Sequence, residues 1–159
     1  MRFFVAGIMQ GSKATKGIHA QDYRQKICRL IRQHFPQAEI YDPLAEHRNS
    51  VDYEAAIGRE VFFRHNRMCR EVDVLVAYLP EASMGTAIEM WEAYQHGAAV
   101  ISISPLRNNW TVCFLSHAIY DDMEQFARGL QSGEVARVIA SVRNRPAENN
   151  PGLAPKPEA

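Results

Sequence analysis

The stretch DVLVAYLPEASMGTAIEMWEAYQHGAAVISISP, residues Asp73–Pro105, is the part of the sequence that predicts the fold. It holds two short apolar runs, Val74–Leu79 and Ala98–Ile103, separated by a segment of helical length. Such runs are typical of buried strands, and a strand–helix–strand unit of this kind makes a parallel crossover. Open parallel sheets bind ligands beyond the carboxyl ends of their strands. We therefore expect a site where the first run meets the helix.

The junction between the first run and the helix reads SMGTAIE, from Ser83 to Glu89. Ser83 and Thr86 supply hydroxyl groups, and Gly85 lets a ligand approach the backbone. Glu89 follows about one turn into the helix, whose free amides and positive dipole end point into the same space. The same residues also fit an ordinary helix start, with a hydroxyl cap and a turn glycine. We expect these four residues to line one pocket.

The rest of the chain predicts further strands and helices in alternation. Apolar spacing indicates an amphipathic helix over His19–Phe35 with its basic residues on the opposite side, and Ser50 or Asp52 is expected to cap the next long helix. The alternation predicts an α/β fold: a flavodoxin-like or Rossmann-like three-layer sandwich with a mainly parallel five-stranded sheet. The predicted strands outside the central stretch are Arg2–Met9, Ala38–Tyr41 and Ala118–Tyr120, and the predicted helices are His19–Phe35, Val51–Glu71, Thr111–His117 (helix or turn), Met123–Leu130 and Glu134–Val142.

Composition restricts the class of protein. With 159 residues, 47% of them apolar, the chain can form one substantial core, so we expect one domain over residues 1–144. Residues 145–159 are rich in proline and polar residues and predict a disordered tail. The 18 basic residues balance the 18 acidic ones, which argues against nucleic acid or an anionic membrane as partner. The opening apolar run is too short to span a bilayer and lacks a signal-peptide cleavage pattern. A small-molecule ligand is expected.

The sequence contains no pattern typical of a metal or cofactor site. Its three cysteines, Cys28, Cys69 and Cys113, are odd in number and form no CxxC pair, which predicts free thiols and a cytoplasmic location. Its six histidines are scattered without zinc-binding spacing. Neither a phosphate-binding loop with its lysine nor a GxGxxG motif is present. We expect neither a metal nor a cofactor.

Four segments, taken in order, resemble the nucleoside 2-deoxyribosyltransferase family and its relatives that hydrolyse the N-glycosidic bond of nucleoside monophosphates. They are FVAGIMQGSK, in which Gly7 and Gly11 form a G-x-x-x-G loop, YDP, the central stretch, and CFLSHAIYDD. The resemblance covers the chain from Arg2 to about Leu130. The GTAIE segment also occurs in lysine-decarboxylase-like phosphoribohydrolases, but those carry a double glycine where this chain has Ala82-Ser83-Met84.

The resemblance implies roles for several residues. Glu89 matches the glutamate that attacks the anomeric carbon, expels the base and forms a glycosyl-enzyme ester, which a second base or water then resolves. Ser83 matches a serine that contacts the sugar or the 5′-phosphate in the hydrolase relatives, and Gly85 matches the glycine beside it. Ser116 matches a serine that crosses from a neighbouring subunit, which implies a homodimer or a larger homo-oligomer.

Two positions depart from the family pattern. An aspartate in the helix before the Asp73 strand assists catalysis in the family, and here that position holds His65 or Asn66. A histidine with an ordinary pKa would suit general acid catalysis, whereas the alternative is a polar residue on a helix face. Gln10 stands where phosphate-specific relatives carry an arginine, which leaves a phosphate to Ser12, Lys13 or the amide of Gly11.

Two further residues are candidates for substrate contact. Asp42, at the end of the second strand, is placed to bind sugar hydroxyls or base amino groups, although aspartate before proline is also an ordinary turn former. Tyr78, at the end of the Val74–Leu79 run, is a candidate to stack on the base.

Three functions remain open on the sequence alone. The first is transfer at the N-glycosidic bond of a nucleoside or nucleoside monophosphate through Glu89. The second is hydrolysis of the same bond, with water as acceptor. The third is non-catalytic nucleotide binding or sensing by a protein that has lost the assisting aspartate. Retention of Glu89 favours catalysis, because a binding protein has no need of a carboxylate beside the anomeric carbon.

Overall fold

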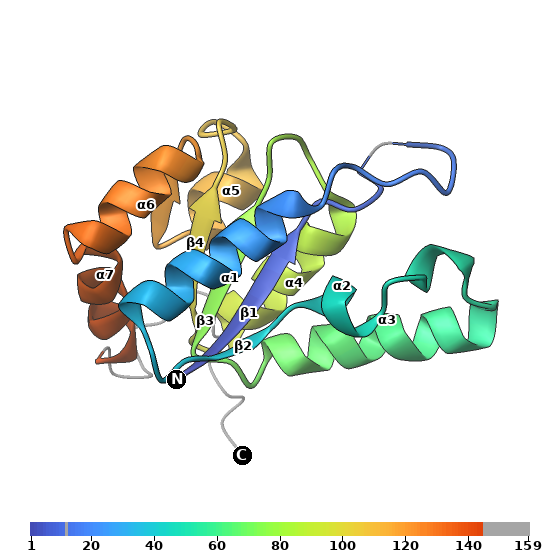
Figure 1. Ribbon diagram of the computed structural model, residues 1–159, viewed down its shortest axis with the longest axis horizontal. Helices are drawn as coiled ribbons and strands as arrows, with labels where there is room; N and C mark the ends of the chain where they lie inside the picture. Colours follow the sequence, from blue (N-terminus) through green and yellow to red (C-terminus); the bar gives the residue numbers. More distant parts are fainter. Residues whose placement is uncertain (12, 145–159) are drawn as a thin grey trace, which may run out of the picture.

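The computed structural model describes residues 1–11 and 13–144, so the predictions for Ser12 and for the 145–159 tail fall outside the described residues (Figure 1). Its sheet contains five strands, all parallel, in the order β2-β1-β3-β4-β5. This is the strand order of flavodoxin-like folds, and it confirms the predicted fold class. The strands are β1 (Arg2–Gly7), β2 (Glu39–Tyr41), β3 (Val74–Tyr78), β4 (Ala99–Ile103) and β5 (Ala118–Tyr120).

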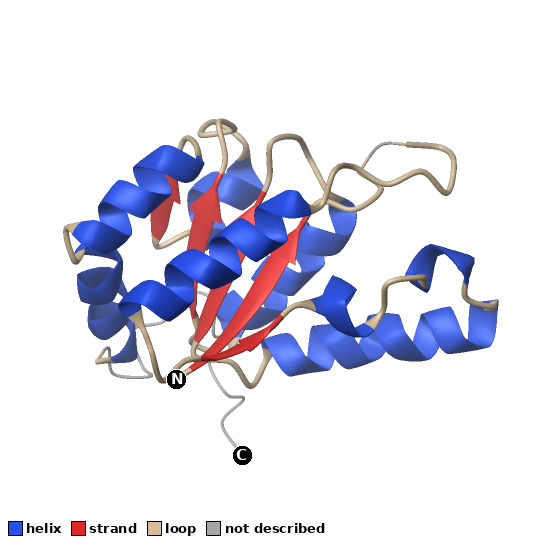
Figure 2. Cartoon of the chain, in the orientation of Figure 1, coloured by secondary structure: helices blue, strands red, loops and turns tan. Residues whose placement is uncertain are grey.

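Helices cover both faces of the sheet and complete the three layers (Figure 2). One face is covered by α1 (Asp22–His34), α6 (Met123–Gln131) and α7 (Glu134–Arg143). The opposite face is covered by α3 (Ala55–Cys69), α4 (Met84–Gln95) and α5 (Trp110–Leu115). A short helix, α2 (Pro43–Glu46), and a single 3₁₀ turn, Ser50–Asp52, connect β2 to α3.

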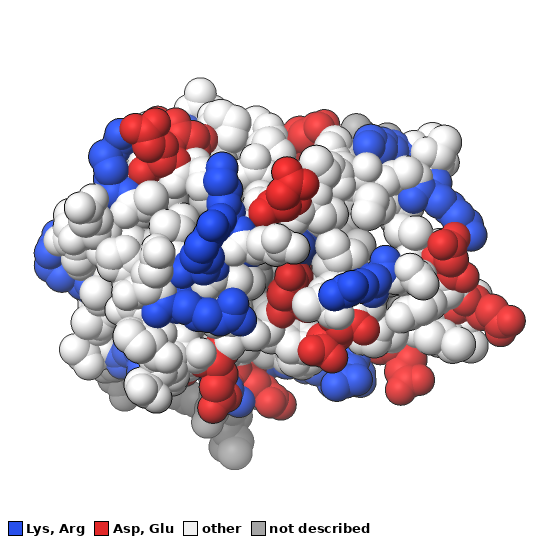
Figure 3. All heavy atoms as spheres, in the orientation of Figure 1, with Lys and Arg blue, Asp and Glu red and all other residues white. Residues whose placement is uncertain are grey.

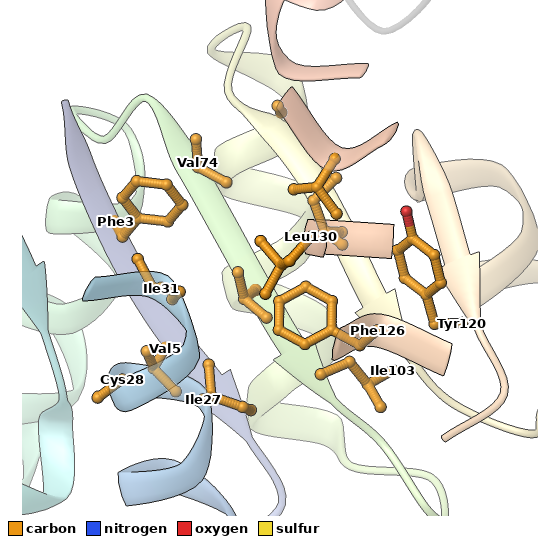
Figure 4. Close-up of a cluster of buried hydrophobic side chains, with 14 of the residues drawn as sticks. Phe3, Val5, Ile27, Cys28, Ile31, Val74, Ile103, Tyr120, Phe126 and Leu130 are labelled. Carbon is orange, nitrogen blue, oxygen red and sulfur yellow. The ribbon is translucent and has the colours of Figure 1, made fainter. Parts of the chain in front are cut away.

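Each face of the sheet has its own core, because successive side chains of a strand point to opposite faces. On β1, Phe3 and Val5 face α1 and α6, whereas Phe4 and Ala6 face α3 and α4. Figure 4 shows the first core, where Phe126 of α6 packs with strand and α1 side chains. Burial on both faces explains why the strands read as continuous apolar runs rather than as alternating patterns.

Several predicted boundaries are wrong, with local physical reasons. The predicted capping of the long helix by Ser50 or Asp52 does not occur, because these residues form the separate 3₁₀ turn and α3 begins only at Ala55. The first helix begins at Asp22 rather than His19, since the His19 amide donates to the Met9 carbonyl (2.7 Å) and closes the preceding loop. Helix α2 was not predicted.

On the face in Figure 3, acidic and basic side chains are interspersed. No helix of the described residues has the length and apolar character needed to cross a bilayer. Within the same residues, no group of three or more His, Cys, Asp or Glu side chains is placed to hold a metal ion.

Candidate functional site

A cavity opens where the paths of two neighbouring strands diverge. Strands β1 and β3 pair in parallel, but β1 leads to α1 on one face and β3 leads to α4 on the other. This is the switch point at which open α/β sheets bind ligands. The cavity there has a volume of about 340 Å³, and we call it the Glu89 cavity. Its lining residues are Gly7, Met9, Gln10, Gly11, Arg24, Pro43, Phe62, His65, Asn66, Ser83, Met84, Gly85, Thr86 and Glu89.

Most of the residues that the sequence predicted for the site lie together in this cavity. The members of the predicted set that line it are Gly7, Gln10, Gly11, His65, Asn66, Ser83, Gly85, Thr86 and Glu89. They come from the β1–α1 loop, from α3 and from the start of α4, and parallel pairing of β1 with β3 brings these segments to one edge of the sheet.

Ser83 caps α4 and also faces the cavity. Its side-chain oxygen accepts a hydrogen bond from the Thr86 amide (3.4 Å) and another from the Thr86 hydroxyl (3.0 Å). A serine hydroxyl has one proton of its own to donate. Because both of these bonds use Ser83 as the acceptor, that proton remains available to a ligand. The capping interpretation is therefore confirmed without excluding a role in binding.

Two glycines line the cavity for different reasons. A Cβ atom built on Gly85 would meet no atom within 4 Å, so the missing side chain leaves open space in the cavity. A Cβ atom on Gly7 would lie 2.6 Å from the hydroxyl oxygen of Tyr23, which is held by a hydrogen bond to the Ile8 carbonyl. Gly7 is therefore required by packing, whereas Gly85 determines the shape of the cavity.

Glu89 is half-buried in the second turn of α4, with protein around its carboxyl group and the cavity beside it. Burial raises the pKa of this carboxyl to about 7, and the nearby Arg24 guanidinium opposes that rise. Both protonation states are thus populated near neutral pH. A carboxyl group with such a pKa is typical of catalytic sites.

Asn66 lines the cavity and holds an unpartnered polar atom. Its side chain is 6% exposed, and its amide nitrogen donates to the Phe62 carbonyl (2.9 Å). Its side-chain oxygen is buried and accepts no hydrogen bond within the described residues. An unsatisfied buried acceptor costs about 1–3 kcal/mol.

His65 lies in an environment that disfavours its charged form. Its Nε2 atom is 3.1 Å from the Tyr41 hydroxyl, and its ring lies against those of Tyr41 and His47. Burial lowers the pKa of His65 to about 4, with smaller contributions from His47 and neighbouring arginines. The imidazole is therefore neutral at pH 7. General acid catalysis by a histidine with an ordinary pKa, as the sequence suggested, is not supported by this environment.

Three residues of the predicted set, Asp42, Tyr78 and Ser116, are not among the residues that line the Glu89 cavity. Asp42 accepts from the Leu44 amide (3.1 Å) at the start of α2, so its alternative interpretation as a turn former is the one that the structure shows. Strand alternation turns Tyr78 toward the α1 face, where its ring stacks on Tyr23 with centroids 4.2 Å apart. The side-chain oxygens of Ser116 and Ser102 are 2.6 Å apart.

Arg24 lines the cavity and was missed by the sequence reasoning, which placed the basic residues of this helix on its exposed side. Arg24 is only 2% exposed, so that expectation is wrong for this residue. A signal was present, because position 24 falls on the buried face of α1 between Tyr23 and Ile27. An arginine within an apolar helix face marks a buried charge that needs partners.

A second, apolar cavity of about 330 Å³ adjoins the first, and the two share Gly11, Ser83 and Met84. Its other lining residues come from the β3–α4 and β4–α5 connections and from the helices that follow: Leu79, Ala82, Ala87, Leu106, Asn109, Thr111 and Val112. Together the two cavities offer a polar compartment around Glu89 and an apolar one beside it. Ligand sites commonly combine these two kinds of lining.

The contrast between the two glycines predicts opposite effects on stability. Gly85→Ala should raise the free energy of unfolding by up to about 1 kcal/mol, because alanine favours the helix and meets no neighbour. Gly7→Ala should lower it, because the new methyl group would collide with Tyr23. Urea denaturation measures both. Equal losses for the two variants would contradict the open space described at Gly85.

The raised pKa of Glu89 predicts a pH-dependent cost to stability. A carboxyl with a higher pKa in the folded state than its usual 4.5 destabilises the fold as pH rises from about 4.5 through about 7. Glu89→Gln should therefore stabilise the protein, with little gain at pH 4 and a gain on the order of 1–3 kcal/mol at pH 8. Chemical denaturation at several pH values measures this gain.

Glu60→Gln, on the exposed surface of α3, is the matched control for Glu89→Gln. It removes the same charge without a buried site, so the difference from the wild type should not grow in the same way between pH 4 and pH 8. A stability gain for Glu89→Gln that stays constant across this range would show that burial of the carboxylate is not its source.

No protein-family model and no curated protein sequence matches this chain. Solved structures do match it. The 2-deoxyribosyltransferase from Bacillus psychrosaccharolyticus is similar with a TM-score of 0.60 and 16% identity, over 80% of this chain and 90% of that one. A conserved protein from Enterococcus faecalis V583 is similar with a TM-score of 0.57 and 18% identity, over 83% and 98%. The chain therefore has the fold of a 2-deoxyribosyltransferase, which confirms at the level of fold the resemblance that its motifs predicted.

Proposed function

We propose that the protein cleaves or transfers the glycosyl group at the N-glycosidic bond of a nucleoside, with Glu89 as the nucleophile. The observation that carries the proposal is the half-buried Glu89 carboxyl in a cavity at the switch point of the sheet, with a pKa near 7. The resemblance of the motifs to the deoxyribosyltransferase family and the shared fold support the same reaction class.

The proposed reaction has two steps. A Glu89 carboxylate oxygen forms a bond to the anomeric carbon while the bond from that carbon to the base nitrogen breaks, and its electron pair leaves with the base. The departing base takes a proton from water, because the His65 imidazole is uncharged at neutral pH. In the second step an acceptor base or water attacks the same carbon, releases the Glu89 carboxylate and gives its proton to solvent.

Neighbouring groups support binding of a sugar that carries hydroxyl groups. The Ser83 hydroxyl retains a proton to donate, and the buried oxygen of Asn66 lacks a donor within the described residues. The hydroxyl groups of a nucleoside can both donate and accept such hydrogen bonds.

We also propose a cytoplasmic location, which agrees with the three free thiols, Cys28, Cys69 and Cys113.

The charges around the cavity favour a nucleoside over a nucleoside monophosphate. Arg24 is the one basic side chain, histidine aside, among the described residues that line either cavity, and its guanidinium already serves several protein acceptors. Lys13, a candidate for phosphate contact, donates to the Ile18 carbonyl instead (2.9 Å). A 5′-phosphate normally requires cationic or amide partners.

A chromatographic assay for released base tests the proposal. Wild-type protein is incubated with ribonucleosides, 2′-deoxynucleosides and their monophosphates, with and without an acceptor base. Nucleosides should be cleaved faster than monophosphates, and Glu89→Gln should lose activity by at least about 100-fold, whereas Glu60→Gln should retain it. Dependence on the acceptor distinguishes a transferase from a hydrolase.

Two results of this assay would contradict the proposal. Full activity of Glu89→Gln would exclude a nucleophilic role for this residue. Absence of turnover on the whole panel, together with a higher melting temperature in the presence of nucleosides, would favour the non-catalytic binding protein, because a ligand that binds only the folded state stabilises it by mass action.

We also propose that the protein is a homodimer, formed through what we call the α4–α5 face. This face consists of five large apolar residues, between 41% and 82% exposed, that repeat at helical spacing on two adjacent helices: Met84, Ile88, Trp91, Trp110 and Phe114. Their exposed surface is on the order of 600 Å². This approaches the roughly 800 Å² per partner of a standard interface and exceeds what isolated surface residues expose.

A second copy of the chain is the partner that suits this face. None of the five side chains is charged, so two copies related by a two-fold axis would bury them without leaving an unpaired ion. Met84 belongs to the face and also lines both cavities, which would place the partner near their opening. The crossing of Ser116 between subunits stays a prediction, and this residue directly follows α5.

Sedimentation equilibrium tests the dimer. The wild type should have twice the chain mass of 18.0 kDa at micromolar concentration, and Trp110→Asp should have the mass of one chain. Ile57→Asp, which alters an exposed apolar residue of α3 outside the α4–α5 face, is the matched control and should remain dimeric. A monomeric wild type, or a dimeric Trp110→Asp variant, would contradict the proposed interface.

A further inference from the structure

Arg24 is held in one place by bonds to three parts of the chain. Its Nη1 atom donates to the Val5 carbonyl (2.8 Å) and its Nη2 atom to the Gly7 carbonyl (3.1 Å), both on β1. Its Nε atom donates to the Gln21 side chain (2.8 Å), and Nη1 also donates to the Asp42 carboxylate (3.1 Å). A guanidinium has five N–H donors, and these four bonds use most of them.

These bonds place a fixed positive charge in the wall of the Glu89 cavity. Arg24 is buried at the carboxyl end of β1, and Glu89 lies in the second turn of the helix that follows β3. Both residues line the same cavity. In surroundings with little water, charge interactions are screened much less than at the surface. A buried guanidinium is therefore well placed to act on a carboxyl group across the cavity.

We propose that Arg24 is a positioning residue that increases the ionised fraction of Glu89 for nucleophilic attack, and that Asp42 anchors it there. This inference rests on the proposed function of Glu89 and adds a residue to it. A positive charge increases the fraction of carboxylate at neutral pH. It also stabilises the carboxylate when the glycosyl group leaves it in the second step, since the negative charge of Glu89 then returns.

The other titratable groups around Glu89 do not supply this charge. On α1, burial raises the pKa of Tyr23 far above its usual range, so its hydroxyl is neutral. On α3, burial likewise raises the pKa of the Cys69 thiol, and the His65 imidazole is neutral because burial lowers its pKa to about 4. On α4, Glu92 is held by Arg70 in a pair of hydrogen bonds of 2.8 and 3.1 Å.

The pH dependence of kcat/KM tests the inference in Arg24→Gln and Arg24→Lys. In the wild type the acid limb, where activity falls as Glu89 takes up a proton, should lie near pH 7. In Arg24→Gln the limb should move up by about one pH unit or more, since an opposite charge nearby shifts a pKa by that amount. Arg24→Lys retains the charge and should keep the limb near its wild-type position.

Arg29→Gln, on the exposed side of the same helix, is the matched control and should leave the profile unchanged. A uniform loss of activity at all pH values in Arg24→Gln, with no shift of the limb, would reduce Arg24 to a structural role and overturn the inference. If Arg24→Gln does not fold, the Arg24→Lys variant tests the inference alone. An acid limb displaced by a full pH unit in Arg24→Lys, despite the retained charge, would equally overturn the inference.

A direct titration separates this inference from the proposed function. The carboxyl carbon of Glu89 is followed by ¹³C NMR against pH, with Glu89→Gln to assign the signal. The titration midpoint should be higher in Arg24→Gln than in the wild type, whether or not any nucleoside is cleaved. An unchanged midpoint overturns the role of Arg24, whereas a shifted midpoint in a protein without activity contradicts only the proposed function.

Discussion

Parallel pairing of β1 with β3 is the constraint on which the rest of the structure depends. The register runs from Phe3 beside Val74 to Gly7 beside Tyr78, so both strands end at the same edge of the sheet. Because the helices that follow them pack on opposite faces, the loops separate and leave a cavity between them. Residues from the β1–α1 loop, from α3 and from α4 meet there, although they are distant in the sequence.

The cavity concentrates charge in a largely uncharged setting. Among the described lining residues, Arg24 carries a full charge near neutral pH and Glu89 is partly ionised. Burial opposes ionisation of the carboxyl, and the guanidinium partly compensates. A fold selected for stability alone would avoid a buried carboxylate with a raised pKa, and such costs are typical of functional sites.

The departures from the family pattern have a physical meaning in this environment. Where the family carries an aspartate, this chain presents the neutral Asn66 amide and the neutral His65 imidazole. Another carboxylate beside Glu89 would raise the pKa of that group further, because like charges repel. Neutral neighbours leave Arg24 as the main charged group that acts on the ionisation of Glu89, against the larger effect of burial.

The sequence by itself determined most of the elements, the parallel topology and the junction around Ser83 and Glu89, because apolar periodicity and helix caps are local signals. Only the tertiary structure decided which residues meet. Tyr78 faces α1 because strand side chains alternate, and Asp42 caps α2 and bonds Arg24 instead of lining the cavity. The burial of Arg24 and the low pKa of His65 could not be predicted from local sequence patterns. Both result from packing against segments that are far away in the sequence.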